Sequence, residues 1–183
     1  LLSKNTIGQS QGEKTESTIA YTDNKGFQIL GYSRASGVKL IMDGGFEFKD
    51  LNKNGKLDVY ENWRLPFDVR AKDLASKMPV EQIAGLMLYS RHQSIPTAGQ
   101  GIYAGTYNGK PFEQSGAGAS DLSDQQKEFL TKDNLRHILI TSVQDQETAV
   151  AWNNNVQALA EATSFGIPVN NSSDPRHGTV ASA

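Results

Sequence analysis

Oxygen-bearing side chains recur at alternate positions between residues 50 and 61, where they could hold a calcium ion. The segment reads Asp-Leu-Asn-Lys-Asn-Gly-Lys-Leu-Asp-Val-Tyr-Glu and fits the calcium-loop pattern at every fixed position. Gly55 would make the sharp turn, and Glu61 would close the coordination shell with two oxygens. The expected oxygen ligands are the side chains of Asp50, Asn52, Asn54, Asp58 and Glu61 and the main-chain carbonyl of Lys56.

The same residues also suit a metal-free polar turn. Asn-Gly and Asp are common in turns, and their side chains could cap a helix near Glu61. The residues before Asp50 are too few and too close to glycines to form the entering helix of a signalling EF-hand. The sequence therefore predicts a structural calcium ion, and the self-capped turn is the open alternative.

A second group of polar residues follows an apolar run near the end of the chain. Residues 170–178 read Asn-Asn-Ser-Ser-Asp-Pro-Arg-His-Gly. At the carboxyl end of a strand, Asp174 could accept two hydrogen bonds from neighbouring sugar hydroxyls, and charge-assisted bonds are the stronger kind. Arg176 and His177 could orient this carboxylate or line a pocket. Asp-Pro followed by Gly is also ordinary turn chemistry, so the local pattern leaves both interpretations open.

The elements that must position these residues follow from hydrophobic periodicity and from glycine and proline signals. Residues 137–140 and 167–170 read as short strands, and residues 145–163 between them form an amphipathic pattern that Gly166 closes. This spacing predicts a right-handed βαβ unit in a parallel sheet, whose ligands bind at the carboxyl ends of the strands. The other expected segments are a polar lead-in at 1–26, β-like runs at 27–30 and 38–42, helices at 63–77, 80–88 and 123–130, and a glycine-rich loop at 92–121.

Three segments resemble glycoside hydrolase family 3. The run Phe-Gly-Ile-Pro-Val at 165–169, followed by Ser-Asp-Pro-Arg-His-Gly at 173–178, resembles the family's apolar strand and Asp-x-x-His-Gly motif. The segment 152–161 resembles the helix that precedes the sugar-binding aspartate. The segment 70–87 is similar to the family's opening signature, with matches at Arg70, Asp73, Leu74, Met78, Glu81, Gly85 and Met87 and departures at Pro79, Gln82 and Ile83.

The resemblance implies an exo-acting, retaining β-glycosidase of the β-glucosidase type. Such enzymes use two carboxyl groups about 5–5.5 Å apart, one as nucleophile and one as acid and then base. Both would lie beyond Ala183, so no catalytic residue is assigned and the chain alone is expected to be inactive. Asp174, Arg176 and His177 are the expected substrate-binding residues, and no cofactor is implied for catalysis.

The expected fold class is α/β, a partial (β/α)8 TIM-like barrel truncated at the C-terminus with an N-terminal extension. The expected organisation is a flexible lead-in and small β-like extension at 1–49, the calcium loop at 50–61 and the barrel portion at 62–183. The expected partners are an oligosaccharide or β-glucoside substrate and the missing C-terminal part of the barrel. The open alternative is a calcium-stabilised carbohydrate-binding or docking module without catalysis.

Composition excludes several other classes of protein. The 183 residues carry a net charge of −2 with no basic patch, so nucleic acid is not an expected partner. No apolar run is long enough to span a membrane. The chain has no cysteine, which excludes disulfides and thiol chemistry. It begins at Leu1 rather than at a methionine, so we expect truncation at both ends. A secreted or periplasmic location is expected only from the family resemblance and the calcium loop.

Overall fold

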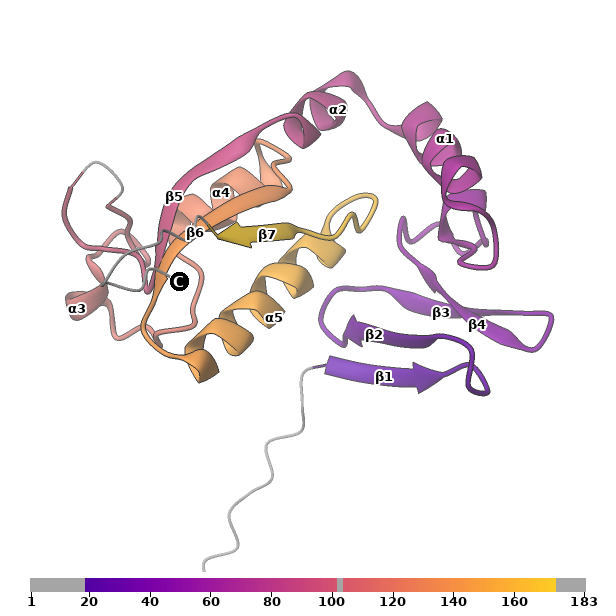
Figure 1. Ribbon diagram of the computed structural model, residues 1–183, viewed down its shortest axis with the longest axis horizontal. Helices are drawn as coiled ribbons and strands as arrows, with labels where there is room; N and C mark the ends of the chain where they lie inside the picture. The colour runs from indigo at the N-terminus through magenta and orange to yellow at the C-terminus, as the bar shows by residue number, and fades with distance from the viewer. Residues whose placement is uncertain (1–18, 102–103, 174–183) are drawn as a thin grey trace, which may run out of the picture.

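The computed structural model describes residues 19–101 and 104–173 of the chain. Two β-hairpins lie at one end of the molecule and a parallel sheet with its helices lies at the other, joined across the top of the view by two short helices (Figure 1). The mixed α/β class expected from the sequence is therefore confirmed.

The N-terminal part consists of two antiparallel hairpins. The first pairs β1 (Ile19–Asp23) with β2 (Ile29–Ser33), and the second pairs β3 (Lys39–Asp43) with β4 (Phe46–Asp50). The two β-like runs of the sequence therefore lie in different hairpins. The polar lead-in was expected to reach residue 26, but the ladder with β2 makes 19–23 a strand.

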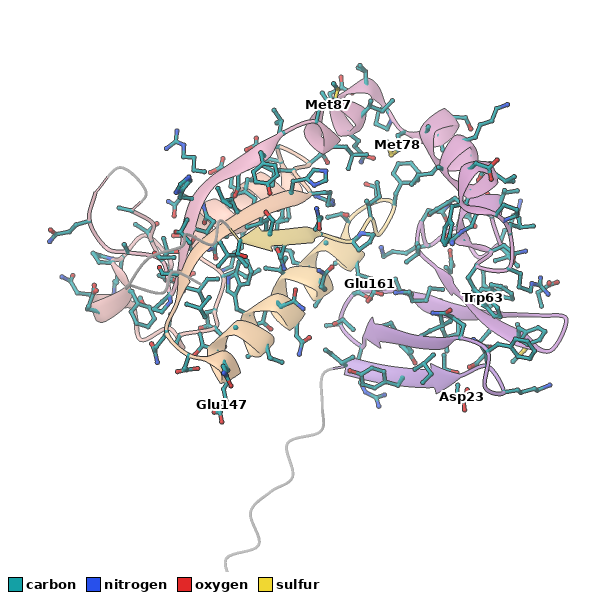
Figure 2. All side chains as sticks on the ribbon, in the orientation of Figure 1. Asp23, Trp63, Met78, Met87, Glu147 and Glu161 are labelled. Carbon is teal, nitrogen blue, oxygen red and sulfur yellow. The ribbon has the colours of Figure 1, made fainter. Side chains whose placement is uncertain are left out.

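A short 3-10 helix and two α-helices connect the hairpins to the parallel sheet. They are η1 (Val59–Glu61), α1 (Phe67–Lys77) and α2 (Val80–Leu86). α1 begins four residues later than expected, with Pro66 as its N-cap, because a proline disfavours the helical conformation for the residue before it. Trp63 instead stacks on Phe48 at 5.2 Å between ring centroids, beside the second hairpin (Figure 2).

The C-terminal part is a three-stranded parallel sheet in the order β5-β6-β7, which are Tyr89–Ile95, His137–Val143 and Asn170–Ser173. Each crossover carries a helix. α4 (Asp124–Thr131) precedes β6 and α5 (Gln146–Ala162) precedes β7, while the short α3 (Phe112–Ser115) lies in the long first crossover. The expected β-α-β unit of β6, α5 and β7 is confirmed in its parallel pairing.

One face of this sheet forms the main hydrophobic core. Ile138 is fully buried and contacts a cluster that includes Leu130 of α4 and Trp152 and Val156 of α5. Both helices therefore cover the same face of the sheet. Because side chains alternate along a strand, His137 and Leu139 point to the opposite face, on which Tyr89 stacks against His137.

Other element boundaries also differ from those expected. The sequence placed residues 92–95 in a loop, but they belong to β5, whose polar residues hide its strand periodicity. β7 begins at Asn170 rather than Ile167, because the Gln157 side chain binds both the N–H and the carbonyl of Val169. α5 is capped at Thr163, so Gly166 lies in the following turn with φ of 57° instead of closing the helix.

The described residues contain no closed barrel, because their strands form two hairpins and one three-stranded sheet. Within the same residues, no helix combines the length and the apolar character needed to cross a bilayer.

Candidate functional site

The loop at 50–61 is closed by two buried carboxylates at its ends. Asp50 is 2% exposed and accepts hydrogen bonds from the main-chain N–H groups of Asn54 and Gly55, at 3.0 and 2.9 Å. Glu61 is 4% exposed and accepts from the N–H groups of Leu51 and Asp58, at 2.7 and 2.9 Å. The first and last expected calcium ligands are thus the residues that hold the loop in shape.

The middle of the loop is organised around Asp58. One of its carboxylate oxygens accepts from the amide groups of Asn52 and Asn54, both at 2.6 Å, and the other lies 3.5 Å from the Lys77 ammonium. Burial raises the pKa of Asp58, but these amides and Lys77 outweigh burial and leave the pKa below its ordinary value. Burial raises the pKa of Glu61, although three main-chain donors oppose that effect. The pKa of Asp58 is therefore lowered and the pKa of Glu61 is raised relative to their ordinary values.

This arrangement tests how well the loop suits a calcium ion. Its donor set is chemically suitable, because all the expected ligands offer hard oxygens. In the part of the chain that the structure describes, however, no three His, Asp or Glu residues gather into a group that could hold a metal. The oxygens are instead engaged by N–H and amide donors of the loop. Calcium at Asp50, Asn52, Asn54, Lys56, Asp58 and Glu61 stays a prediction.

A polar stripe on α5 positions β7, and the sequence interpretation missed it. Asn153, Gln157 and Glu161 follow one another at intervals of four and therefore share a helix face. The amide of Asn171 in β7 donates to Asn153 at 2.7 Å, and Gln157 bonds both main-chain groups of Val169. The four-residue spacing was a visible signal, but the apolar stripe of the same helix dominated the pattern.

The connection between α5 and β7 is also held from the start of β6. Arg136 is 5% exposed and donates to the carbonyl of Ile167 at 3.0 Å and to the hydroxyl of Thr163 at 2.9 Å. It also donates to the carbonyls of Leu130 and Leu135. Burial lowers the pKa of this guanidinium. A buried cation among neutral oxygens fixes the amino end of β7 through several bonds at once.

The expected sugar-binding residues follow directly after β7. The strand ends at Ser173, and Asp174, Arg176 and His177 lie outside the described residues. On the uncovered face of the sheet, the Tyr89 hydroxyl contacts the hydroxyl of Ser172. The strand sequence Asn-Asn-Ser-Ser places polar groups at the carboxyl end of the sheet, where parallel α/β folds bind their ligands.

The fold and these polar residues define an α/β protein whose ligand site is expected at the carboxyl end of a parallel sheet. No family model matches the chain. It is 39% identical over 140 residues to a periplasmic beta-glucosidase/beta-xylosidase of Dickeya chrysanthemi. The matched region covers 76% of this chain and 19% of that protein. The chain is also 27% identical over 128 residues to beta-glucosidase C of Emericella nidulans, and 25% identical over 126 residues to a probable beta-glucosidase C of Aspergillus oryzae.

These matches confirm the resemblance: the chain is homologous, over about three quarters of its length, to β-glucosidases of glycoside hydrolase family 3. The two fungal matches cover 70% and 68% of this chain and 18% and 17% of their own proteins. The chain thus spans less than a fifth of the length of the curated relatives that it matches.

Proposed function

We propose that this chain is the N-terminal part of a retaining, exo-acting β-glycosidase that removes terminal β-linked sugars, with glucosides as the main substrate class. The observation that carries the proposal is the sequential parallel order β5-β6-β7, with β7 ending one residue before Asp174. In an α/β sheet of this kind the carboxyl ends of strands carry the chemistry. The names of the relatives support hydrolysis over binding alone.

The three strands would be the first part of a (β/α)8 barrel. α4 and α5 cover one face of the sheet, and the other face, with Tyr89, His137 and Leu139, carries none of the main core cluster. In a barrel the uncovered face is the interior and the helices form an outer ring. This arrangement supports a barrel that further strands of the same protein complete, and these strands would bring the nucleophile and the acid/base residue.

In this proposal the Asp174 carboxylate accepts hydrogen bonds from hydroxyl groups of the terminal sugar, and Arg176 and His177 line the same pocket. Hydrogen bonds to sugar hydroxyls strengthen as the ring distorts towards the oxocarbenium-like transition state, so they lower the barrier as well as bind. Asp174 is neither nucleophile nor acid. The Dickeya relative is named as periplasmic, which supports a working place outside the cytoplasm. The loop at 50–61 would hold a structural calcium ion.

The role of Asp174 is tested by kinetics of the complete protein on an aryl β-glucoside. We expect Asp174→Ala to lower kcat/KM by about 100-fold, because a charge-assisted contact made in the transition state is lost. Asp68→Ala, on the exposed surface of α1, is the matched control and should leave kcat/KM unchanged. A loss for Asp174→Ala below about threefold, under about 1 kcal/mol, would contradict the role.

A further inference from the structure

The N-terminal hairpins contact the C-terminal end of α5 through a small number of side chains. A cavity of about 460 Å3 lies between the two parts, lined on one side by residues such as Tyr32 and Lys49 and on the other by Asn154 and Ala158. The side-chain contacts around this cavity therefore help to set the position of the hairpins against α5. Glu161 lies there, between α5 and the hairpins (Figure 2).

Lys53 of the 50–61 loop caps the last turn of α5. Its ammonium lies 3.2, 3.4 and 3.0 Å from the carbonyl oxygens of Glu161, Ala162 and Thr163. The last carbonyls of a helix have no partner within the helix, and a cation there also complements the helix dipole. A residue between two expected calcium ligands thus satisfies the end of a helix more than 100 positions later in the sequence.

Glu161, in the last turn of α5, makes a second set of contacts, from the helix to the hairpins. Its carboxylate accepts from the main-chain N–H of Ser33 in β2 at 2.7 Å and from the ammonium of Lys49 in β4 at 2.7 Å. The Glu161 side chain is 9% exposed, so the ion pair is partly shielded from water. Both hairpins are therefore bound to the last turn of α5.

Two packing contacts bring the same loop onto the turn between α5 and β7. The Leu51 side chain lies so close to Gly166 that a Cβ there would come within 2.8 Å of it. Gly166 also has a φ of 57°, which favours glycine. The ring of Tyr60 packs edge-on against Phe165, at 6.3 Å between centroids. Leu51, Lys53 and Tyr60 thus contact the 163–166 turn from one side.

These contacts add to those that Asn153, Gln157 and Arg136 make with β7 and the residues before it, and they matter because the strand is short. It has four residues, and in the described structure it pairs only with β6. Its amino end is reached directly from the 163–166 turn, and its carboxyl end leads into Asp174. We propose that Lys53 and Glu161 are positioning residues, which fix the end of α5 and so set the placement of β7, the strand that ends one residue before Asp174. This inference rests on the proposed function of Asp174.

The first test is hydrogen exchange by mass spectrometry on the complete protein. Lys53→Met removes the cap and keeps the aliphatic stem, and Glu161→Gln removes the ion pair to Lys49. We expect each to speed exchange in residues 163–173 by about fivefold or more, with α4 unchanged. Lys72→Met is the matched control, because Lys72 is an exposed lysine of α1, and it should match the wild type. Lys53→Arg should restore protection.

The second test is a double-mutant cycle on kcat/KM. If Lys53 acts through the Asp174 loop, Lys53→Met should lower kcat/KM about tenfold in the wild type and less than twofold in an Asp174→Ala background. Equal effects in both backgrounds, or exchange at 163–173 within twofold of wild type, would overturn the inference. If Asp174→Ala itself has no effect, the proposed function fails, whereas faster exchange in Lys53→Met would still show that the anchor exists.

Discussion

At the scale of single residues, the best-defined polar centre is Gln126 at the start of α4. The residue is 1% exposed, and its side chain makes four hydrogen bonds. Its oxygen accepts from the N–H of Ser123 at 3.0 Å and from the indole of Trp152 at 3.2 Å, and its nitrogen donates to Gln93 and Thr97. One amide thereby ties α4 to both α5 and the end of β5.

We expect Gln126→Leu to lower the free energy of unfolding by about 3 kcal/mol. Leucine has a similar volume but leaves the buried Trp152 and Ser123 donors unpaired, and each such group costs about 1–3 kcal/mol. Urea unfolding followed by fluorescence measures the loss. The control is Gln125→Leu, because Gln125 is the exposed neighbour and should cost less than about 1 kcal/mol. Equal losses for the two variants would show that the network contributes little.

At the scale of elements, the 50–61 loop satisfies its own polar groups with the same side chains that the calcium pattern assigns as ligands. Glu61 accepts from the N–H of Asp58, which is the metal-free cap that the sequence left as the alternative. The same carboxylate is the expected bidentate ligand at the twelfth position. Calcium binding would therefore replace N–H donors by the ion at Glu61, and the two interpretations would then correspond to a metal-free and a metal-bound state of the same loop.

We expect calcium at about 100 times its Kd to raise the Tm by about 5 °C or more, because a ligand that binds only the folded state stabilises it by about 2.7 kcal/mol at that concentration. Differential scanning calorimetry with and without chelator measures the shift. Asp50→Ala should abolish it, and the exposed Asp68→Ala should retain it. An unchanged transition in excess chelator would reject the calcium site.

At the scale of the whole molecule, the parallel sheet is open at both sides. Among the described residues β5 and β7 each pair only with β6, and an unpaired strand edge is a template for another strand. The chain spans about a fifth of the Dickeya relative, so the proposed barrel needs strands from the rest of the protein. The nucleophile and the acid/base residue are expected on those strands.

The 183-residue chain by itself should therefore hydrolyse an aryl β-glucoside no faster than buffer. Retaining hydrolysis needs two carboxyl groups about 5–5.5 Å apart, and sugar-binding groups cannot replace them. A fluorogenic glucoside assay measures turnover, with the complete protein as the positive control. Turnover by the chain alone that disappears in Asp174→Ala would show that the catalytic pair lies within these residues, contrary to the proposal.

The sequence predicted elements best where local signals agree. The expected helices at 123–130 and 145–163 begin at the residues that the structure shows to be the N-caps of α4 and α5, Ser123 and Asp145. Predictions failed where the local pattern is weak or where a residue from another element decides the boundary. β5 was missed because its strand pattern is masked by polar residues, and Gln157 moves the start of β7 by binding Val169.

The sequence alone indicated the resemblance to β-glucosidases, the α/β class and the spacing of the calcium-loop oxygens, because motifs and periodicities are local properties of the chain. Only the tertiary structure revealed that Lys53 caps α5 and that Glu161 binds both hairpins. These contacts join residues more than 100 positions apart, and which of many charged side chains meet depends on how the helices and strands pack. No spacing rule within the chain encodes such a pairing.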